Sequence, residues 1–143
     1  MKRMTRLFPW GALALVLVGC GGTYVDDKRN FERAFRSPQP RDVKVIHSLY
    51  WQSPHFTDEH CYFFELQPLN GSDILKTLTA ARDVVPATAG VTQVPKLVLD
   101  PPPWFAPKAL EAYDAWISTN QFWTFGVLRD QQEGRIFVYG QSL

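Results

Sequence analysis

Two runs of alternating side chains constrain the fold of this chain more than any other feature. Residues 43–51 alternate at the period of a β-strand, and residues 61–66 do so again beyond a polar loop at 54–59. Pro68 ends the second run, because proline has no N–H to donate to a strand ladder. The short loop between the two runs therefore predicts an antiparallel hairpin.

One clear helix is predicted directly after this hairpin. The segment Asn70-Gly71-Ser72 is typical of a turn, and Ser72 or Asp73 can cap a helix. Apolar residues then recur on one helical face until about Asp83, and Pro86 ends the helix. These apolar residues are Ile74, Leu75, Leu78 and Ala81.

The last third of the chain predicts further short strands. We expect strands at 122–129 and 135–141, joined by a turn in which Gly134 takes a left-handed conformation. Residues 96–100 favour another short strand. Residues 108–118 favour a helical turn followed by a strand, and a single helix over 108–116 is the alternative.

These elements predict an α+β domain at 42–143, with a small antiparallel sheet of five or six strands and one main helix packed on one face. Beyond residue 19 the chain keeps 18 aromatic residues, which suffice for one compact core in a domain of this size.

The N-terminus reads as a targeting segment. Lys2, Arg3 and Arg6 form a basic region, and residues 7–18 then run for twelve residues without a charge. As a helix, this run would span about 18 Å. A bilayer core is about 30 Å thick, so the run predicts a signal peptide at 1–19 and not a membrane-spanning helix.

The end of this run carries a specific motif, Leu17-Val18-Gly19-Cys20. It resembles the bacterial lipoprotein lipobox, which is cleaved just before the cysteine, and the resemblance covers residues 1–22. It implies a thioether-linked diacylglycerol on Cys20 and an acylated amino terminus, which together anchor a protein stably to a membrane. The alternative is an ordinary secretory signal that happens to end in a cysteine.

The resemblance also implies a location in the bacterial cell envelope. Gly21 stands where an Asp would retain a lipoprotein in the inner membrane, so in a cell with two membranes we expect the outer membrane, facing the periplasm. Residues 20–41 would then be the lipidated cysteine and a tether, either a solvated linker or a loose helical turn. Phe31 and Phe35 could cover the domain. Four basic residues of the tether could lean on anionic headgroups, but three nearby acids offset most of their charge.

Charge and cysteine content limit the partners. Without the three basic residues of the signal, 12 basic and 14 acidic residues remain, a net charge of −2, and we expect no nucleic-acid partner and a monomer. If Cys20 carries lipid, Cys61 has no partner for an intramolecular disulfide. Its place in a strand-like run predicts a buried thiol.

The sequence holds few candidates for catalytic or metal-binding residues. The segment from His55 to Cys61 is rich in metal-ligating residue types, and His47 could lie nearby across the hairpin, but the spacing matches no zinc pattern. His60 and Cys61 point to opposite faces of a strand and so cannot act as base and nucleophile. We therefore expect no metal, no cofactor and no enzymatic activity.

The best binding candidates are Trp104 and Phe105, which follow three prolines in a stiff segment at 101–107. They either stay exposed as a contact surface or fold down as a lid over the sheet. The expected function is that of a non-enzymatic protein-binding lipoprotein, such as an inhibitor, an immunity-like protein or an adaptor. The alternative is a structural or accessory lipoprotein of an envelope assembly, or one that contacts peptidoglycan.

Overall fold

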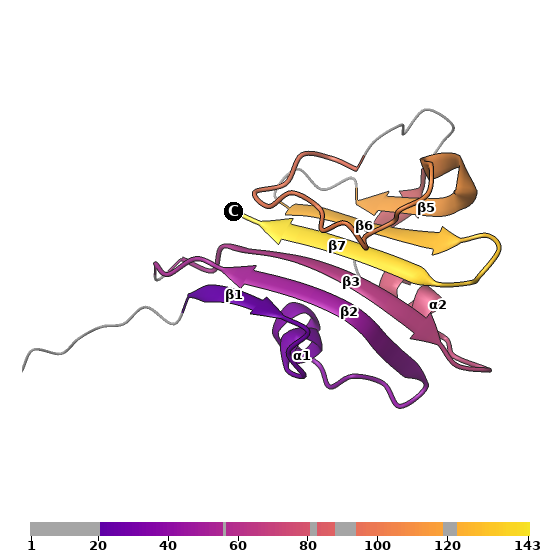
Figure 1. Ribbon diagram of the computed structural model, residues 1–143, viewed down its shortest axis with the longest axis horizontal. Helices are drawn as coiled ribbons and strands as arrows, with labels where there is room; N and C mark the ends of the chain where they lie inside the picture. Colours follow the sequence, from indigo (N-terminus) through magenta and orange to yellow (C-terminus); the bar gives the residue numbers. More distant parts are fainter. Residues whose placement is uncertain (1–20, 56, 81–82, 88–93, 119–122) are drawn as a thin grey trace, which may run out of the picture.

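The computed structural model describes residues 21–55, 57–80, 83–87, 94–118 and 123–143, which build one antiparallel β-sheet (Figure 1). Its strands lie in the order β1-β2-β3-β7-β6-β5-β4. Strands β1 to β3 and strands β4 to β7 each pair with their neighbours in the sequence, and the two groups meet where β3 pairs with β7. The strands are β1 (Gly22–Val25), β2 (Val43–Gln52), β3 (His60–Pro68), β4 (Val84–Pro86), β5 (Tyr113–Ser118), β6 (Trp123–Asp130) and β7 (Ile136–Ser142). The helical elements are α1 (Asn30–Phe35), α2 (Ile74–Ala80) and a 3-10 turn, η1 (Leu110–Ala112).

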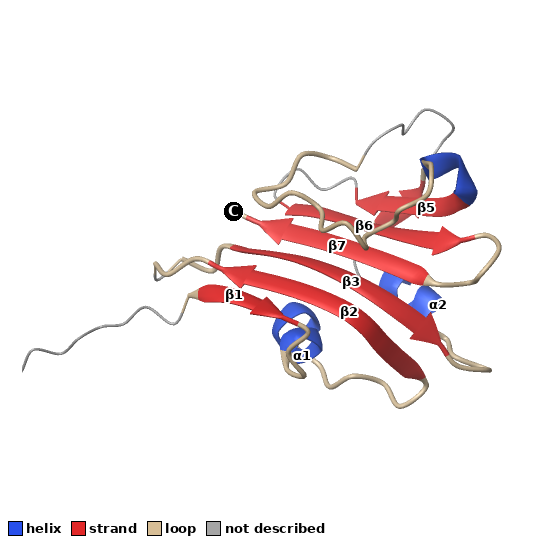
Figure 2. Cartoon of the chain, viewed as in Figure 1, coloured by secondary structure: helices blue, strands red, loops and turns tan. Residues whose placement is uncertain are grey.

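The predicted fold class is wrong, because the structure is mostly β (Figure 2). The described residues form seven strands and two short α-helices, in place of five or six strands and one main helix. The edge strands β1 and β4 have four and three residues, too few to show an alternating pattern. They form because each finds a partner in the sheet, β2 for β1 and β5 for β4.

The hairpins, in contrast, are predicted correctly. β2 pairs with β3 from Val43–Pro68 to Gln52–His60, and β6 pairs with β7 across a turn in which Gly134 has a φ of 67°. The helical turn before β5 is η1. The strand expected at 96–100 is absent from the described residues, where this segment is irregular.

The central strand β3 is buried on both faces of the sheet. Tyr62, Phe64 and Leu66 face one hydrophobic cluster, together with residues of α1 and α2. Cys61 and Phe63 face a second cluster on the opposite side. A strand buried on both faces carries apolar residues at neighbouring positions, and residues 61–64 of β3 are all apolar or aromatic.

The second face is covered by an irregular segment, residues 94–112, which we call the strap. Leu97 and Phe105 of the strap are buried in the second cluster, and further apolar strap residues pack around them. Lys108 fixes the strap to the end of β6, because its Nζ lies 2.7 Å from Oδ2 of Asp130. The molecule therefore has three layers: two helices, the sheet and the strap.

The segment predicted as a tether belongs to this domain instead. β1 pairs with β2 from Gly22 onward, and α1 packs on the sheet directly afterwards. Asn30 is fully buried and its side-chain amide donates to the carbonyl of Tyr24, at 2.9 Å, and to Oγ of Ser48, at 3.0 Å. Within the described residues, sheet pairing is therefore already present from Gly22, inside the segment expected to be a tether.

Candidate functional site

An apolar groove lies between α1 and α2 on the helical face of the sheet. It has a volume of about 140 Å³. The residues that line it come from both helices, from the chain after α1 and from β6: Phe31, Phe35, Ser37, Pro40, Ile74, Thr77, Leu78 and Phe125.

The two helices build the walls of this groove because each turns its apolar side to the sheet. Phe31 and Phe35 of α1 lie 4.5 Å apart between ring centroids, and the Phe35 ring lies 5.6 Å from that of Tyr62. Ile74 and Leu78, one turn apart on α2, are both buried. The space that remains between them keeps an apolar lining.

The rim of the groove is polar and open. Ser37 and Thr77 are exposed, whereas Phe31, Leu78 and Phe125 are buried below them. An apolar hollow with a polar rim is the arrangement that receives an anchoring side chain at protein interfaces. This groove can therefore receive an apolar side chain. Among the described residues that line it, the only polar side chains are the hydroxyl groups of Ser37 and Thr77, and none is acidic or basic.

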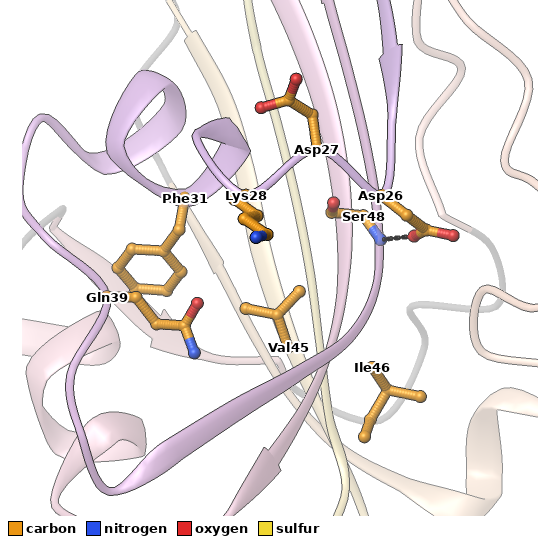
Figure 3. Close-up of a pocket in the computed structure, with 8 residues that line it drawn as sticks. All are labelled: Asp26, Asp27, Lys28, Phe31, Gln39, Val45, Ile46 and Ser48. Atoms are coloured by element: carbon orange, nitrogen blue, oxygen red, sulfur yellow. Dashed lines mark hydrogen bonds between the residues drawn. The ribbon is translucent and has the colours of Figure 1, made fainter.

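A second cavity, of about 180 Å³, lies at the open edge of β2 beyond the end of β1 (Figure 3). Asp26 caps this edge. Its Oδ1 accepts a hydrogen bond from the backbone N–H of Ser48 at 2.8 Å, and its own N–H donates to the carbonyl of Ser48 at 2.8 Å. His47 adds a contact of 3.4 Å between its Nδ1 and Oδ2 of Asp26.

Asp27, the other acidic residue that lines this cavity, also has partners within the chain. Oδ1 of Asp27 accepts the backbone N–H of Arg29 at 2.8 Å and lies 3.0 Å from Nη1 of Arg33. The hydrogen bond from Arg29 is the main reason that the pKa of Asp27 lies below its ordinary value, and Arg33 lowers it further. A carboxylate held ionised in this way is a poor general acid or base near neutral pH, so Asp27 is unsuited to proton transfer, and Asp26 is already engaged at the sheet edge.

Trp104 and Phe105, the predicted binding pair, have different environments. Phe105 is buried, with its ring 5.0 Å from that of Phe63 and 5.7 Å from that of Phe137. Trp104 is half-buried and stacks on the ring of His47 at 5.3 Å. The lid alternative is therefore correct for Phe105, which cannot serve as a contact surface while it fills the core.

The other predicted site residues lie apart from one another. Cys20 lies outside the described residues. Cys61 is fully buried, as predicted. His47 lies opposite Glu65 in the β2–β3 register and not beside the loop before β3, where Nδ1 of His60 is 2.8 Å from the carbonyl oxygen of Asp58. Among the described residues, no cluster of three or more His, Cys, Asp or Glu side chains is placed to hold a metal ion.

Sequence reasoning missed the groove. One signal pointed to it, the spacing of Phe31 and Phe35, which places both rings on one side of a helix. Phe125 and Leu78 enter the groove only through the packing of β6 and α2, which no local pattern contains.

Comparison with known proteins adds no family: no family model, curated protein or solved structure matches the chain. In the part of the chain that the structure describes, no helix is both long and apolar enough to cross a membrane.

Proposed function

We propose that this protein is a lipid-anchored protein of the bacterial envelope that binds a protein partner without catalysing a reaction. The groove between α1 and α2 is the observation that carries the binding part of this proposal. The anchoring part rests on the resemblance of Leu17-Val18-Gly19-Cys20 to a lipobox.

The size of the groove suits one large apolar side chain. Its volume is about 140 Å³, and an apolar protein cavity of roughly 150 Å³ is large enough to hold a benzene molecule. A leucine or phenylalanine of a partner would therefore fill it, while Ser37 and Thr77 at the rim are placed to hydrogen-bond the partner's backbone.

The ionisable groups support a binding role over a catalytic one. Three carboxylates already pair with basic groups of the same chain: Asp114 with Arg129, Glu65 with Arg135 and Asp130 with Lys108. The pKa values of Asp114 and Asp130 are lowered by these partners, so both groups stay ionised.

Site-specific photo-crosslinking in cells tests the binding proposal. A crosslinking amino acid at Thr77, on the rim, should capture one defined protein, whereas the same amino acid at Gln132, on the exposed β6–β7 turn, should not. Ser37→Glu should reduce the capture from Thr77, because it places a charge beside the groove, and Ala80→Glu, exposed on α2 outside the lining, should leave it unchanged. Equal capture from Thr77 and Gln132, or none from either, would contradict a binding role for the groove.

Labelling cells with a fatty-acid probe tests the anchor separately. The wild-type protein should take up the label, and Cys20→Ser should remove it and leave the signal peptide uncleaved. Equal label on both proteins would contradict lipidation at Cys20.

A further inference from the structure

We infer that the corner of the domain formed by β1, α1 and the β2–β3 loop lies directly on an anionic membrane surface. This inference rests on the proposed lipidation of Cys20 and adds the orientation of the domain to it.

The first observation is that almost no chain separates the anchor from the fold. Gly21 is the one residue between Cys20 and β1, and Gly22 already pairs with Gln52. At no more than about 3.6 Å per residue, the lipid-bearing Cys20 would lie within roughly 7 Å of Gly22. A linker of this length cannot hold the domain away from the bilayer.

Gly21 is itself fixed against the domain. A Cβ at Gly21 would lie 2.2 Å from the backbone nitrogen of Pro54, so the chain passes in close contact with the start of the β2–β3 loop. In Figure 1, β1 begins at the same end of the sheet as this loop and the C-terminus. A lipid on Cys20 would therefore bring this end of the sheet to the membrane.

The second observation is the charge on the outer side of α1. Arg29, Glu32, Arg33 and Arg36 line a shallow hollow there; Arg33 also pairs with Asp27, whereas Arg29 and Arg36 are exposed. Residues three and four apart lie on one face of a helix, so the three arginine side chains leave α1 on the same side, and those of Arg29 and Arg36 stay exposed. Such a cluster attracts the phosphates of anionic lipids.

The arginines lie close to the anchor. Nη2 of Arg36 is 3.2 Å from Oδ1 of Asp58 in the β2–β3 loop, and both side chains are exposed. The guanidinium of Arg33 lies 4.0 Å above the ring of Tyr24 in β1. Exposed ion pairs are weak, so pairing with Asp58 leaves Arg36 able to contact a lipid phosphate as well.

The two sides of α1 would then have separate roles. Arg29 and Arg36, which flank it, are exposed, whereas Phe31 is buried and Phe35 packs against the core, where both line the groove. Headgroup contact at the arginines therefore leaves the groove open to a protein partner.

Fluorescence quenching in vesicles tests this orientation. The mature lipidated protein, with lipid on Cys20 established by mass spectrometry, is placed in vesicles of phosphatidylcholine and phosphatidylglycerol that carry a quencher on their headgroups. A fluorophore at Thr57→Cys, in the β2–β3 loop, should be strongly quenched, and one at Gln132→Cys, at the far end of the sheet, should not be. Because β6 spans eight residues, these ends are separated by roughly 24 Å.

Two kinds of variant separate the effect of the short tether from the effect of the arginine charges. Inserting a long Gly/Ser segment between Cys20 and Gly21 should leave the protein bound to vesicles but abolish the quenching at position 57. Arg29→Gln with Arg36→Gln should weaken that quenching, whereas Lys44→Gln with Lys76→Gln, a matched pair of exposed cations elsewhere, should not.

The outcomes distinguish the two proposals. Equal quenching at positions 57 and 132 in lipidated protein would overturn the orientation and leave the anchor intact. Absence of lipid on Cys20 would overturn both.

Discussion

At the scale of single residues, Cys61 shows how burial controls reactivity. Its side chain is fully buried, and burial raises the pKa of its thiol to about 11. The thiolate is the reactive form, so a thiol with a raised pKa and no exposure should be inert near neutral pH.

We therefore predict that the Cys61 thiol of the folded protein reacts slowly with a thiol reagent and reacts fully once denaturant is added. Thr57→Cys, an exposed position in the β2–β3 loop, should add one thiol that reacts at once. The measurement is the time course of labelling in the Cys20→Ser background. Rapid labelling of Cys61 in the native protein would contradict its burial.

Trp104 and Phe105 show how far neighbouring residues can differ. Both stand in a proline-rich segment without periodicity, so the sequence gives no indication of which ring points inward. The structure buries Phe105 among Phe63, Phe137 and Tyr139, and leaves Trp104 half-buried on His47.

Phe105→Ala should therefore lower the free energy of unfolding by about 3–5 kcal/mol, as for other buried aromatic residues. Trp104→Ala should cost only about 1 kcal/mol, because the ring loses one stacked partner and part of its cover. Urea melts of the two variants and the wild type measure the difference. Similar losses for both variants would show that the strap does not separate the two rings in this way.

At the scale of elements, the long strands could be predicted from the sequence and the short elements could not. The β2–β3 and β6–β7 hairpins have long alternating strands and turn residues such as Gly134, and both were predictable. β1, β4 and α1 are too short to carry a pattern and exist because the sheet pairs with them or packs on them. These elements form because of tertiary contacts, which a short stretch of sequence does not contain.

The β6–β7 turn depends on one carboxylate. Oδ1 of Asp130 accepts the backbone N–H groups of Gln132, at 2.8 Å, and of Glu133, at 3.0 Å. Its other oxygen pairs with Lys108 of the strap. The Lys108 ammonium and these N–H groups lower the pKa of Asp130 from 3.8 to about 2.

A lowered pKa in the folded state stabilises the protein above the pKa of the unfolded state. The contribution of Asp130 should therefore be complete above about pH 4 and be lost as the pH falls through about 2. Asp130→Asn should lower stability at neutral pH and flatten the fall in stability on acidification. Urea melts across this pH range measure both effects, and parallel pH profiles for the variant and the wild type would contradict this role.

At the scale of the whole molecule, distant segments are brought together by one pairing. β3 and β7 join the series β1–β2–β3 to the series β4–β5–β6–β7. The groove exists only because this pairing sets α1, from the first series, beside α2 and the β6 residue Phe125. Its lining spans Phe31 to Phe125, and this explains why residue patterns could predict the hairpins but not the site.

The pairing of β3 with β7 also sets the order in which the chain can fold. β3 is complete at Pro68, but its partner β7 begins only at Ile136, so the edge of β3 that faces β7 stays unpaired until Ile136–Ser142 has been synthesised. Until that pairing forms, this edge belongs to a strand that is buried on both faces in the folded protein, and it is a template for aggregation. A truncation before Ile136 would expose the edges of β3 and β6 together, so completion of the sheet waits for β7 to pair between them.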